Sequence, residues 1–521
     1  MDDGAERDAR EYVTPIGVQI TDDELFKANL LVPPGLIHLT GEEGWHMFFD
    51  KENHVWVRLN ESGKEIIESL RSHPDLAASI EEIARRFNLS PSDIQGKVLE
   101  FVRTMIDARI VHVDRYVIQK QAEKLAADHP YTVYFSNTER CNLTCPYCYN
   151  ADSRSRHSKL KEEMTTDESK RALKMLKDFG VMNVAFCGGE PMCRPDILEI
   201  ASYAKSIGLY TAIVTNGTLI TDKVAPKVAE LFDLVWVSLD SAVKEEHEAM
   251  RGKGSYQRTM RALRLLTKYR PQKFIVNSVV TKLNVYSMPE THRIMVDEFH
   301  VDLHRMSAYM ETAGITYDKN GRPIEGITND PSYHDVFYSA GLKLELGGDE
   351  LPPIEVFKED GVIVKKGLRR IQCGFASGDI HMVSNGDIYP CVMLYEEGFK
   401  CGNIMEEDIA KIYRESEVMN RCREATIDKI EECEGCFVKY ICAGGCRASA
   451  YHKYGSLTAY PRDLCGVLKQ SAVDSMWYDT RIPLEKMKRA AMAYKEKLAE
   501  IQKSTNAQVP VTVDEAGGSK Q

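Results

Sequence analysis

Three cysteines lie within ten residues of the sequence, in the stretch CNLTCPYCYN from Cys141 to Asn150. Their spacing is C-x3-C-x2-C. A structural zinc site uses four ligands and a disulfide framework uses an even number of cysteines, so three thiolates fit neither. Three thiolates leave one position of a metal centre open, and chemistry can take place there. The stretch therefore predicts a reactive metal centre.

Seven more cysteines form a second pattern toward the end of the chain. Twelve residues separate Cys373 from Gly386, and four residues separate Gly386 from Cys391. The stretch CEGCFVKYICAGGC has the spacing C-x2-C-x5-C-x3-C, and a single cysteine follows it; these five are Cys433, Cys436, Cys442, Cys446 and Cys465. The chain has fourteen cysteines, and its first residues are polar and acidic, unlike a signal peptide. This combination favours metal ligation over disulfides. A pair of zinc ribbons is the simpler alternative for the C-x2-C pattern.

Residues 131–345 alternate strand and helix patterns that can position these groups. Repeated βα units predict a parallel sheet with right-handed crossovers, and six of them predict an open, partial barrel of the α/β class. The loop of three cysteines follows the first strand, at the rim where sites of such sheets lie. The expected strands are 132–136, 183–186, 210–215, 234–239, 274–281 and 302–309, with helices such as 166–179 and 255–269 between them.

Glycine and polar residues follow the second, third and fourth expected strands. The stretches are CGGEP (187–191), TNGT (215–218) and SLDS (238–241). The two glycines of the first allow a ligand to approach the backbone closely. Each stretch alone also reads as an ordinary turn. Their order along a βα array is the specific signal.

This order resembles the radical S-adenosylmethionine (SAM) superfamily. The resemblance implies that Cys141, Cys145 and Cys148 bind a [4Fe–4S] cluster and that SAM chelates its fourth iron. An electron from the cluster would break the sulfonium C–S bond and release a 5′-deoxyadenosyl radical. The resemblance implies that Gly188, Gly189 and Glu190 hold the methionyl amine of SAM and that Arg251 binds its methionyl carboxylate. It also implies that Tyr147 lies near the adenine and that Ser238, Asp240 and Asn216 lie on the ribose side. A solvated surface charge is the alternative for Arg251.

The C-terminal cysteines resemble a SPASM domain, which holds two auxiliary [4Fe–4S] clusters and would bring the total to three. The resemblance assigns Cys433, Cys436, Cys442 and Cys465 to one auxiliary cluster, and Cys373, Cys391 and Cys446 to the other. The second set lacks a fourth cysteine. Either Cys401 completes it, or its open iron takes a substrate thiolate. We expect Cys187, Cys193 and Cys422 to be packing residues.

Residues 1–115 read as a hairpin (45–59) followed by three amphipathic helices, the outline of a winged helix. A DNA-binding role is disfavoured, because this segment has 22 Asp and Glu against 13 Lys and Arg, and the whole chain has a formal charge of −11. The stretch VRLNESGKEIIESL (57–70) resembles the recognition element of peptide maturases. That resemblance implies that a precursor's leader adds as a strand to the hairpin edge, against a helix.

The combined resemblance is to a radical SAM/SPASM peptide maturase of the sactipeptide or ranthipeptide type. A thioether crosslink in the core peptide is the leading product, and a carbon–carbon crosslink is next. Sulfatase maturases place an Asp base after the Gly-x4-Cys cysteine, where Val392 stands here and cannot take a proton. Quinone-cofactor or mycofactocin-type maturation and a non-catalytic, metal-stabilised peptide-binding regulator remain as alternatives.

The expected organisation is a recognition domain (1–115), a linker (116–130), the partial barrel (131–345), a bridge (346–372), the SPASM domain (373–470) and a C-terminal helix near 484–502 within a tail (471–521). We expect the segment from Cys373 onward to be irregular and held together by metals. No run of eighteen apolar residues occurs, so a cytoplasmic enzyme without membrane or nucleic-acid partners is expected. It would need an electron donor such as flavodoxin or ferredoxin.

Overall fold

The computed structural model describes residues 22–33, 35–41, 44–50, 55–108, 110–113, 129–148, 163–309, 316–317, 323–326, 344–345, 355–359, 362–366, 373–466, 468–469 and 472–473. The expected helix near 484–502, the tail and most of the linker lie outside these residues. Among the described residues, no helix combines the length and the apolar character needed to cross a bilayer.

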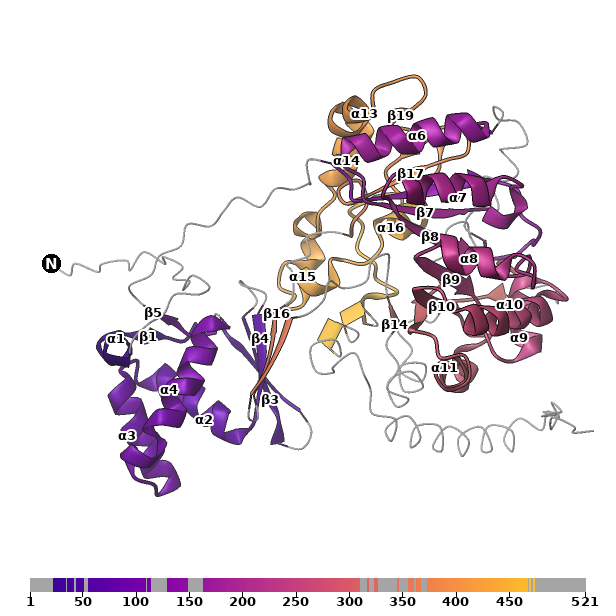
Figure 1. The fold of residues 1–521 in the computed structure, drawn as a ribbon. Helices are drawn as coiled ribbons and strands as arrows, with labels where there is room; N and C mark the ends of the chain where they lie inside the picture. Colours follow the sequence, from indigo (N-terminus) through magenta and orange to yellow (C-terminus); the bar gives the residue numbers. More distant parts are fainter. Residues whose placement is uncertain are drawn as a thin grey trace, which may run out of the picture.

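A ten-stranded sheet forms the centre of the molecule, on the right of Figure 1. Six parallel strands lie side by side in chain order, as predicted. They are β6 (Thr132–Thr138), β7 (Asn183–Gly188), β8 (Tyr210–Thr215), β9 (Leu234–Ser238), β10 (Lys273–Val280) and β11 (Leu303–Ala308). The outer two pair with other strands: β11 with β14 (Leu344–Glu345) and β6 with β17 (Asp379–Met382), beyond which lie β18 (Asp387–Tyr389) and β19 (Gly402–Asn403). The barrel is therefore open.

Helices connect the parallel strands. The first, α6 (Thr166–Phe179), begins at a reciprocal capping box between Thr165 and Glu168 and ends at Gly180, whose φ is 113°. It was predicted with these bounds. The others are α7 (Ile197–Ser206), α8 (Ala225–Leu231), α9 (Lys244–Arg251), α10 (Ser255–Tyr269) and α11 (Met288–Asp297).

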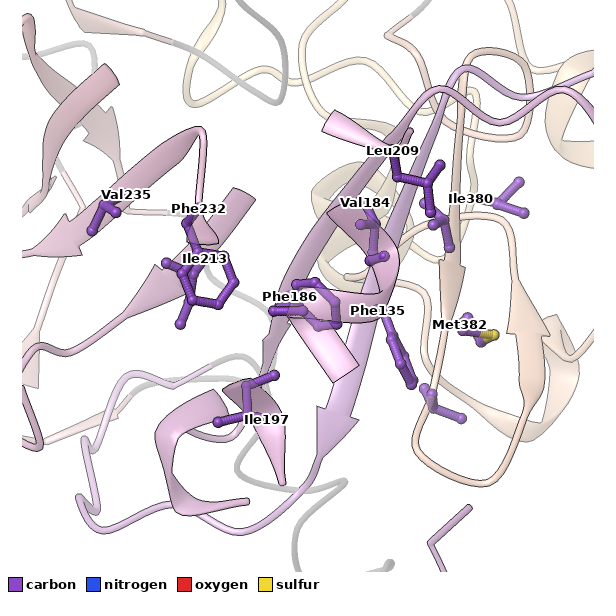
Figure 2. Close-up of a cluster of buried hydrophobic side chains, with 14 of the residues drawn as sticks. Phe135, Val184, Phe186, Ile197, Leu209, Ile213, Phe232, Val235, Ile380 and Met382 are labelled. Atoms are coloured by element: carbon purple, nitrogen blue, oxygen red, sulfur yellow. The ribbon is translucent and has the colours of Figure 1, made fainter. Parts of the chain in front are cut away.

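The core lies between this sheet and its helices. Figure 2 shows Phe135, Phe186 and Phe232 in contact within it, and all three side chains are fully buried. Their ring centroids are 5.9 Å apart for Phe135 and Phe186 and 6.0 Å apart for Phe186 and Phe232. Burial of such large apolar side chains is the main stabilising contribution to the barrel.

The N-terminal unit contains the predicted hairpin and three helices. The hairpin is β3 (His46–Asp50) and β4 (Val55–Leu59), and Asn60 then caps α2 by accepting a hydrogen bond from the Gly63 amide at 2.9 Å. The helices are α2 (Glu61–Ser72), α3 (Leu76–Phe87) and α4 (Pro91–Asp107). The unit also contains α1 (Asp22–Lys27), β1 (Leu30–Leu31), β2 (Ile37–Thr40) and β5 (His112–Val113).

Strands β2, β3 and β4 of this unit are part of a five-stranded sheet with the strand order β15–β16–β4–β3–β2. Strands β15 (Glu355–Glu359) and β16 (Val362–Lys366) come from the predicted bridge, and Figure 1 shows β16 beside β4. The register runs antiparallel from Val362 opposite Leu59 to Lys366 opposite Val55. Both strands of the predicted hairpin therefore have neighbours on both sides. The open hairpin edge expected from the sequence is already paired, because distant segments supply β2 and β16.

The two faces of this sheet have different partners. One face packs in a core shared with α2, α3 and α4. The other buries Met47, Phe49 and Trp56 against Val438 and Ile441 of the cysteine-rich segment. Ile441 belongs to α15 (Lys439–Cys442), which lies beside the sheet in Figure 1. The N-terminal sheet thus covers the C-terminal cysteine motif.

The segment from Cys373 onward is more regular than the sequence predicts. Besides β17–β19 it forms α13 (Ile409–Glu415), α14 (Glu417–Arg423) and α16 (Arg447–Tyr454). Ile380, Met382 and Met419 are buried in the same apolar cluster as the barrel. The expectation of an irregular segment was wrong for its first half, because its apolar side chains pack on the barrel's core and it forms helices and strands. A short hairpin, β12 (Thr316–Tyr317) and β13 (Pro323–Ile324), completes the described elements.

Candidate active site

A cavity of about 410 Å³ lies at the carboxyl ends of the barrel strands. Its wall contains the loop of three cysteines on one side and cysteines of the C-terminal segment on the other. The predicted site residues in the wall are Cys141, Cys145, Cys148, Tyr147, Gly188, Gly189, Glu190, Asn216, Ser238, Arg251, Cys373, Cys391, Cys442 and Cys446. One enclosed space therefore connects the two cysteine groups.

The loop after β6 gathers Cys141, Cys145 and Cys148. Burial raises the pKa of the Cys145 thiol to about 12, with Arg251, Cys148 and Cys141 as its charged or ionisable neighbours. A metal centre deprotonates such a thiol, because the metal's charge replaces the lost solvation. Among the described residues, no three His, Cys, Asp or Glu side chains converge on a single metal ion. The donor set fits an iron–sulfur cluster, in which each thiolate ligates a different iron.

Two glycines bring the next strand end against this loop. Gly188 has a φ of 112°, and a Cβ there would lie 2.4 Å from the Thr138 carbonyl oxygen. A Cβ on Gly189 would lie 2.3 Å from the Arg140 carbonyl oxygen. Only glycine fits at either position, since real Cβ atoms do not come this close to backbone oxygen. The backbone amide of Gly189 donates to the Thr138 carbonyl at 2.9 Å, which fixes the approach.

Glu190 follows the glycines and is almost fully buried. Its carboxylate accepts hydrogen bonds from the Thr215 hydroxyl (2.6 Å) and the Asn216 backbone amide (2.7 Å). Burial raises the pKa of Glu190, and these hydrogen bonds oppose the rise only in part. The Asn216 side chain donates to the Asn142 side-chain oxygen at 3.0 Å, so the TNGT loop is tied to the cysteine loop.

Asp240, at the end of β9, is completely buried and does not line the cavity. Its carboxylate accepts from the Tyr147 hydroxyl at 2.6 Å and from Arg251 Nε at 2.6 Å and Nη2 at 3.0 Å. Burial alone would raise the pKa of Asp240, but Arg251 outweighs it and holds that pKa below its usual value. The expected contact of Asp240 with the ribose side is therefore corrected, because its oxygens hold Tyr147 and Arg251 instead.

Arg251 is not the solvated surface charge that the sequence left open. Only 9% of the residue is exposed, and the guanidinium lies over the Tyr147 ring at 5.7 Å from its centroid. Asp240 fixes it bidentately at the wall of the cavity, close to Cys145. A guanidinium in that position can bind a carboxylate of a ligand in the cavity.

The structure brings together both predicted sets of C-terminal cysteines. Burial raises the pKa of the Cys442 thiol to about 12, and the nearby Cys433, Cys436 and Cys465 raise it further. Burial likewise raises the pKa of Cys391, with Cys446 and Cys373 as neighbours. The neighbours belong to the groups named by the resemblance, and the ligation of one cluster by each group stays a prediction.

Cys401 is not among the residues that line the cavity. Its thiol donates to the Phe399 carbonyl at 3.5 Å and forms a hydrogen bond with Ser416. Cys422 is its cysteine neighbour and is fully buried, as expected for a packing residue. Cys187 is buried at the wall, and its thiol contacts the Ser136 hydroxyl at 3.8 Å. Cys373, Cys391 and Cys446, in contrast, all line the cavity.

Sequence reasoning missed the polar residues of the barrel interior. Ser307 donates to the Asn277 side-chain oxygen at 2.9 Å, and the Arg305 guanidinium stacks on the Trp236 ring at 4.9 Å. All four line the cavity. The signal was present, because Arg305 and Ser307 alternate with apolar residues in one strand and so share the inner face.

Comparison with known proteins agrees with this geometry. Residues 136–293 match the Radical SAM superfamily, residues 46–111 match the coenzyme PQQ synthesis protein D (PqqD) family, and residues 373–437 match SPASM, the iron-sulfur cluster-binding domain.

The chain is 28% identical over 343 residues to an AdoMet-dependent heme synthase of Methanosarcina barkeri, covering 63% of this chain and 93% of the relative. It is 28% identical over 334 residues to a PqqA peptide cyclase of Bradyrhizobium diazoefficiens, covering 62% and 82%. The solved structure of anSMEcpe with bound AdoMet superposes with a TM-score of 0.51 at 19% identity, covering 67% and 98%; this likeness establishes the fold.

The open parallel barrel, with thiols and a buried arginine at its rim, defines an enzyme that uses SAM and iron–sulfur clusters. The chain carries a radical SAM domain at residues 136–293, a PqqD-type domain before it at residues 46–111 and a SPASM domain after it at residues 373–437.

Proposed function

We propose that this enzyme acts in the cytoplasm on a ribosomally made precursor peptide, binding its leader and crosslinking its core. The observation that carries the proposal is the shared cavity, whose wall contains the first cysteine loop and the three-cysteine set of the SPASM domain. A side chain held there lies within reach of both. The PqqD domain favours a peptide over the heme suggested by the name of one relative.

When bound, SAM with its cluster supplies a 5′-deoxyadenosyl radical, and two auxiliary clusters accept electrons from an external partner or the substrate. In this proposal Cys141, Cys145 and Cys148 hold the first of three clusters. Arg251 binds the methionyl carboxylate as a charge-assisted pair. Gly188, Gly189 and Glu190 face the methionyl amine, while Ser238, Asn216 and Tyr147 surround the nucleoside. A flavodoxin or ferredoxin supplies the reducing electron.

A thioether is the favoured product in this proposal. Cys373, Cys391 and Cys446 line the cavity while Cys401 does not, which supports an open fourth position toward the substrate. A peptide cysteine can occupy that position as a thiolate, which fixes its sulfur near the reacting carbon. The peptide would lose one hydrogen atom to the deoxyadenosyl radical, one proton from the thiol and one electron on C–S bond formation. The product would be two hydrogens lighter.

A precursor whose cysteines are replaced by serine tests the bond type. We expect the cysteine peptide to lose two hydrogens and to resist alkylation, and the serine peptide to remain at its original mass. The serine hydroxyl is a poor ligand for iron, so the sulfur is what places the reacting group. Mass spectrometry after anaerobic turnover provides the measurement. Loss of two hydrogens from the serine peptide at an unchanged rate would replace the thioether by a carbon–carbon crosslink.

The leader, in this proposal, binds at the β4 edge by displacing β16. Strand β2, the free edge on the hairpin side of the sheet, has four residues and follows Pro33, which disfavours strand addition there. Strand β4 has five residues, and its side chains are buried on both faces of the sheet. A leader strand on β4 would form the same main-chain hydrogen bonds that β16 forms, so the exchange changes few bonds.

Replacing residues 355–366 with a Gly-Ser spacer should therefore tighten leader binding. If β16 leaves the β4 edge free about one tenth of the time, the apparent affinity for the leader is about tenfold weaker than the affinity of the free edge. Removing β16 should restore that tenfold difference. Fluorescence anisotropy would measure this with a labelled leader from a short cysteine-rich peptide encoded beside the gene. The same spacer in place of residues 316–324, which form β12 and β13 outside this sheet, is the control. Unchanged or weaker binding without residues 355–366 would place the leader elsewhere.

A further inference from the structure

Arg447 is a buried arginine that follows the last cysteine of the GGC stretch and begins α16. Only 1% of the residue is exposed, and it is the largest of the fully buried side chains. The radical SAM barrel does not use it, and it does not line the cavity. An arginine so deeply buried needs a compensating negative charge, because its guanidinium stays protonated in proteins.

Among the described residues, the hydrogen bonds of the guanidinium go to backbone carbonyl oxygens. Nε donates to Gly445 at 3.3 Å, and Nη1 donates to Leu457 at 3.2 Å and Ala459 at 3.4 Å. Nη2 is buried without a hydrogen-bond partner. Within the part of the chain that the structure describes, no carboxylate pairs with Arg447. Carbonyl dipoles satisfy some of the donors but do not neutralise the charge.

The backbone leaves room beside the partnerless Nη2. Gly444 has a φ of 71°, and a Cβ at this position would lie 2.9 Å from Nη2. A side chain there would displace the guanidinium. Because the AGGC stretch has glycine at this position, Nη2 can keep its place, and the N–H groups of Nη2 stay available to an acceptor.

The backbone places the Arg447 guanidinium between cysteines of the two C-terminal sets. Nε donates to the carbonyl oxygen of Gly445 and Nη2 lies beside Gly444, and these glycines stand between Cys442 of one set and Cys446 of the other. Cys373 and Cys433 are further electrostatic neighbours of the guanidinium. Iron–sulfur clusters with thiolate ligands carry net negative charge. Two of them would supply the counter-charge that the protein itself lacks at this position.

We propose that Arg447 is the shared counter-charge of the two auxiliary clusters, donating Nη2–H to a cluster sulfur and making both clusters easier to reduce. The inference rests on the proposed presence of both clusters. A positive charge between two redox centres stabilises an electron on either one, because each reduction adds negative charge beside the guanidinium. Hydrogen bonds to cluster sulfurs shift the potential in the same direction. Arg447 is then a positioning residue for electron transfer and does not touch the peptide.

Redox titration of the holoenzyme followed by electron paramagnetic resonance tests this role. In Arg447→Met, the potentials of both auxiliary clusters should become more negative. Arg447→Lys, which keeps the charge without the planar set of donors, should give a smaller shift. The cluster of Cys141, Cys145 and Cys148, recognised by its spectral change on SAM addition, should keep its potential. Unchanged auxiliary potentials, or a shift of one cluster alone, would overturn the shared role.

Arg423→Met is the matched control. Arg423 is also buried and donates to the carbonyls of Ala376 (2.8 Å) and Tyr413 (2.6 Å), but its guanidinium stacks on the Tyr413 ring. Its loss should leave the auxiliary potentials in place; an equal shift would indicate general loosening and count against Arg447. If Arg447→Met fails to retain iron, Arg447→Gln carries the same expectation. Iron content separates the two proposals, since a wild-type enzyme with fewer than three clusters contradicts the proposed function before Arg447 is tested.

Discussion

Alanine in place of Cys141, Cys145 and Cys148 is expected to abolish SAM cleavage while about two thirds of the iron remains. The wild-type enzyme should carry about twelve irons, roughly four for each of three clusters, and the variant about eight. The loop supplies the three thiolates proposed for the cluster that SAM chelates, and all three line the cavity. Iron analysis and chromatography of 5′-deoxyadenosine, formed with a strong reductant and without peptide, provide the measurement.

Cys422→Ala is the control for this experiment. Cys422 is fully buried but lies outside both the cavity and the predicted ligand sets, so this variant should keep about twelve irons and normal SAM cleavage. Deoxyadenosine from the triple variant would contradict the assignment of the loop. Zinc in the wild-type protein, without the broad absorbance of iron–sulfur clusters, would contradict the whole cofactor assignment.

Asp240→Asn is expected to lower the free energy of unfolding of the barrel by about 3–5 kcal/mol, the usual cost of removing one partner of a buried ion pair. The change keeps the shape of the side chain and removes its charge. Arg251 would then be a buried cation without a counter-charge, and Tyr147 would lose a strong acceptor. SAM should also bind more weakly, because both residues line its proposed site. Calorimetry and equilibrium binding of SAM measure the two effects.

Asp178→Asn removes a carboxylate of the same kind from an exposed pair. Asp178 pairs with Lys174 one helical turn away on α6, and both side chains are more than half exposed. Such pairs contribute about 0.3–0.5 kcal/mol, so this variant should be nearly as stable as the wild type. Equal stability of the two variants would show that Arg251 finds another counter-charge when Asp240 is lost.

Local patterns predicted the barrel well because its units are locally determined. The bounds of α6 follow from its capping box and from Gly180, those of α10 follow from apolar residues at helical spacing, and the strands follow from short apolar runs. The grouping of the C-terminal cysteines came from the resemblance to the SPASM domain. All but one of the predicted SAM contacts reached the cavity wall, since the carboxyl ends of parallel strands meet at one edge.

The remaining features depend on contacts between distant segments. Nothing near Val362 indicates that it pairs with Leu59. Asp240 follows β9 as predicted, yet the positions of Arg251 and Tyr147 decide that its carboxylate faces inward. The segment after Cys373 has little periodicity of its own because it packs on a core that the barrel already provides. Single-residue patterns carry no information about such partners.

The pairing of β16 with β4 also sets an order of assembly on the ribosome. Residues 46–107 can form their helices and hairpin early, but the β4 edge stays unpaired until residue 366 has been synthesised. During that interval the nascent chain exposes an unprotected strand edge, a template for association with other chains. The face of the sheet that contains Met47, Phe49 and Trp56 stays uncovered for longer, until Val438 and Ile441 have been synthesised. Slower translation and chaperone supply should therefore improve the yield of full-length protein more than added iron does.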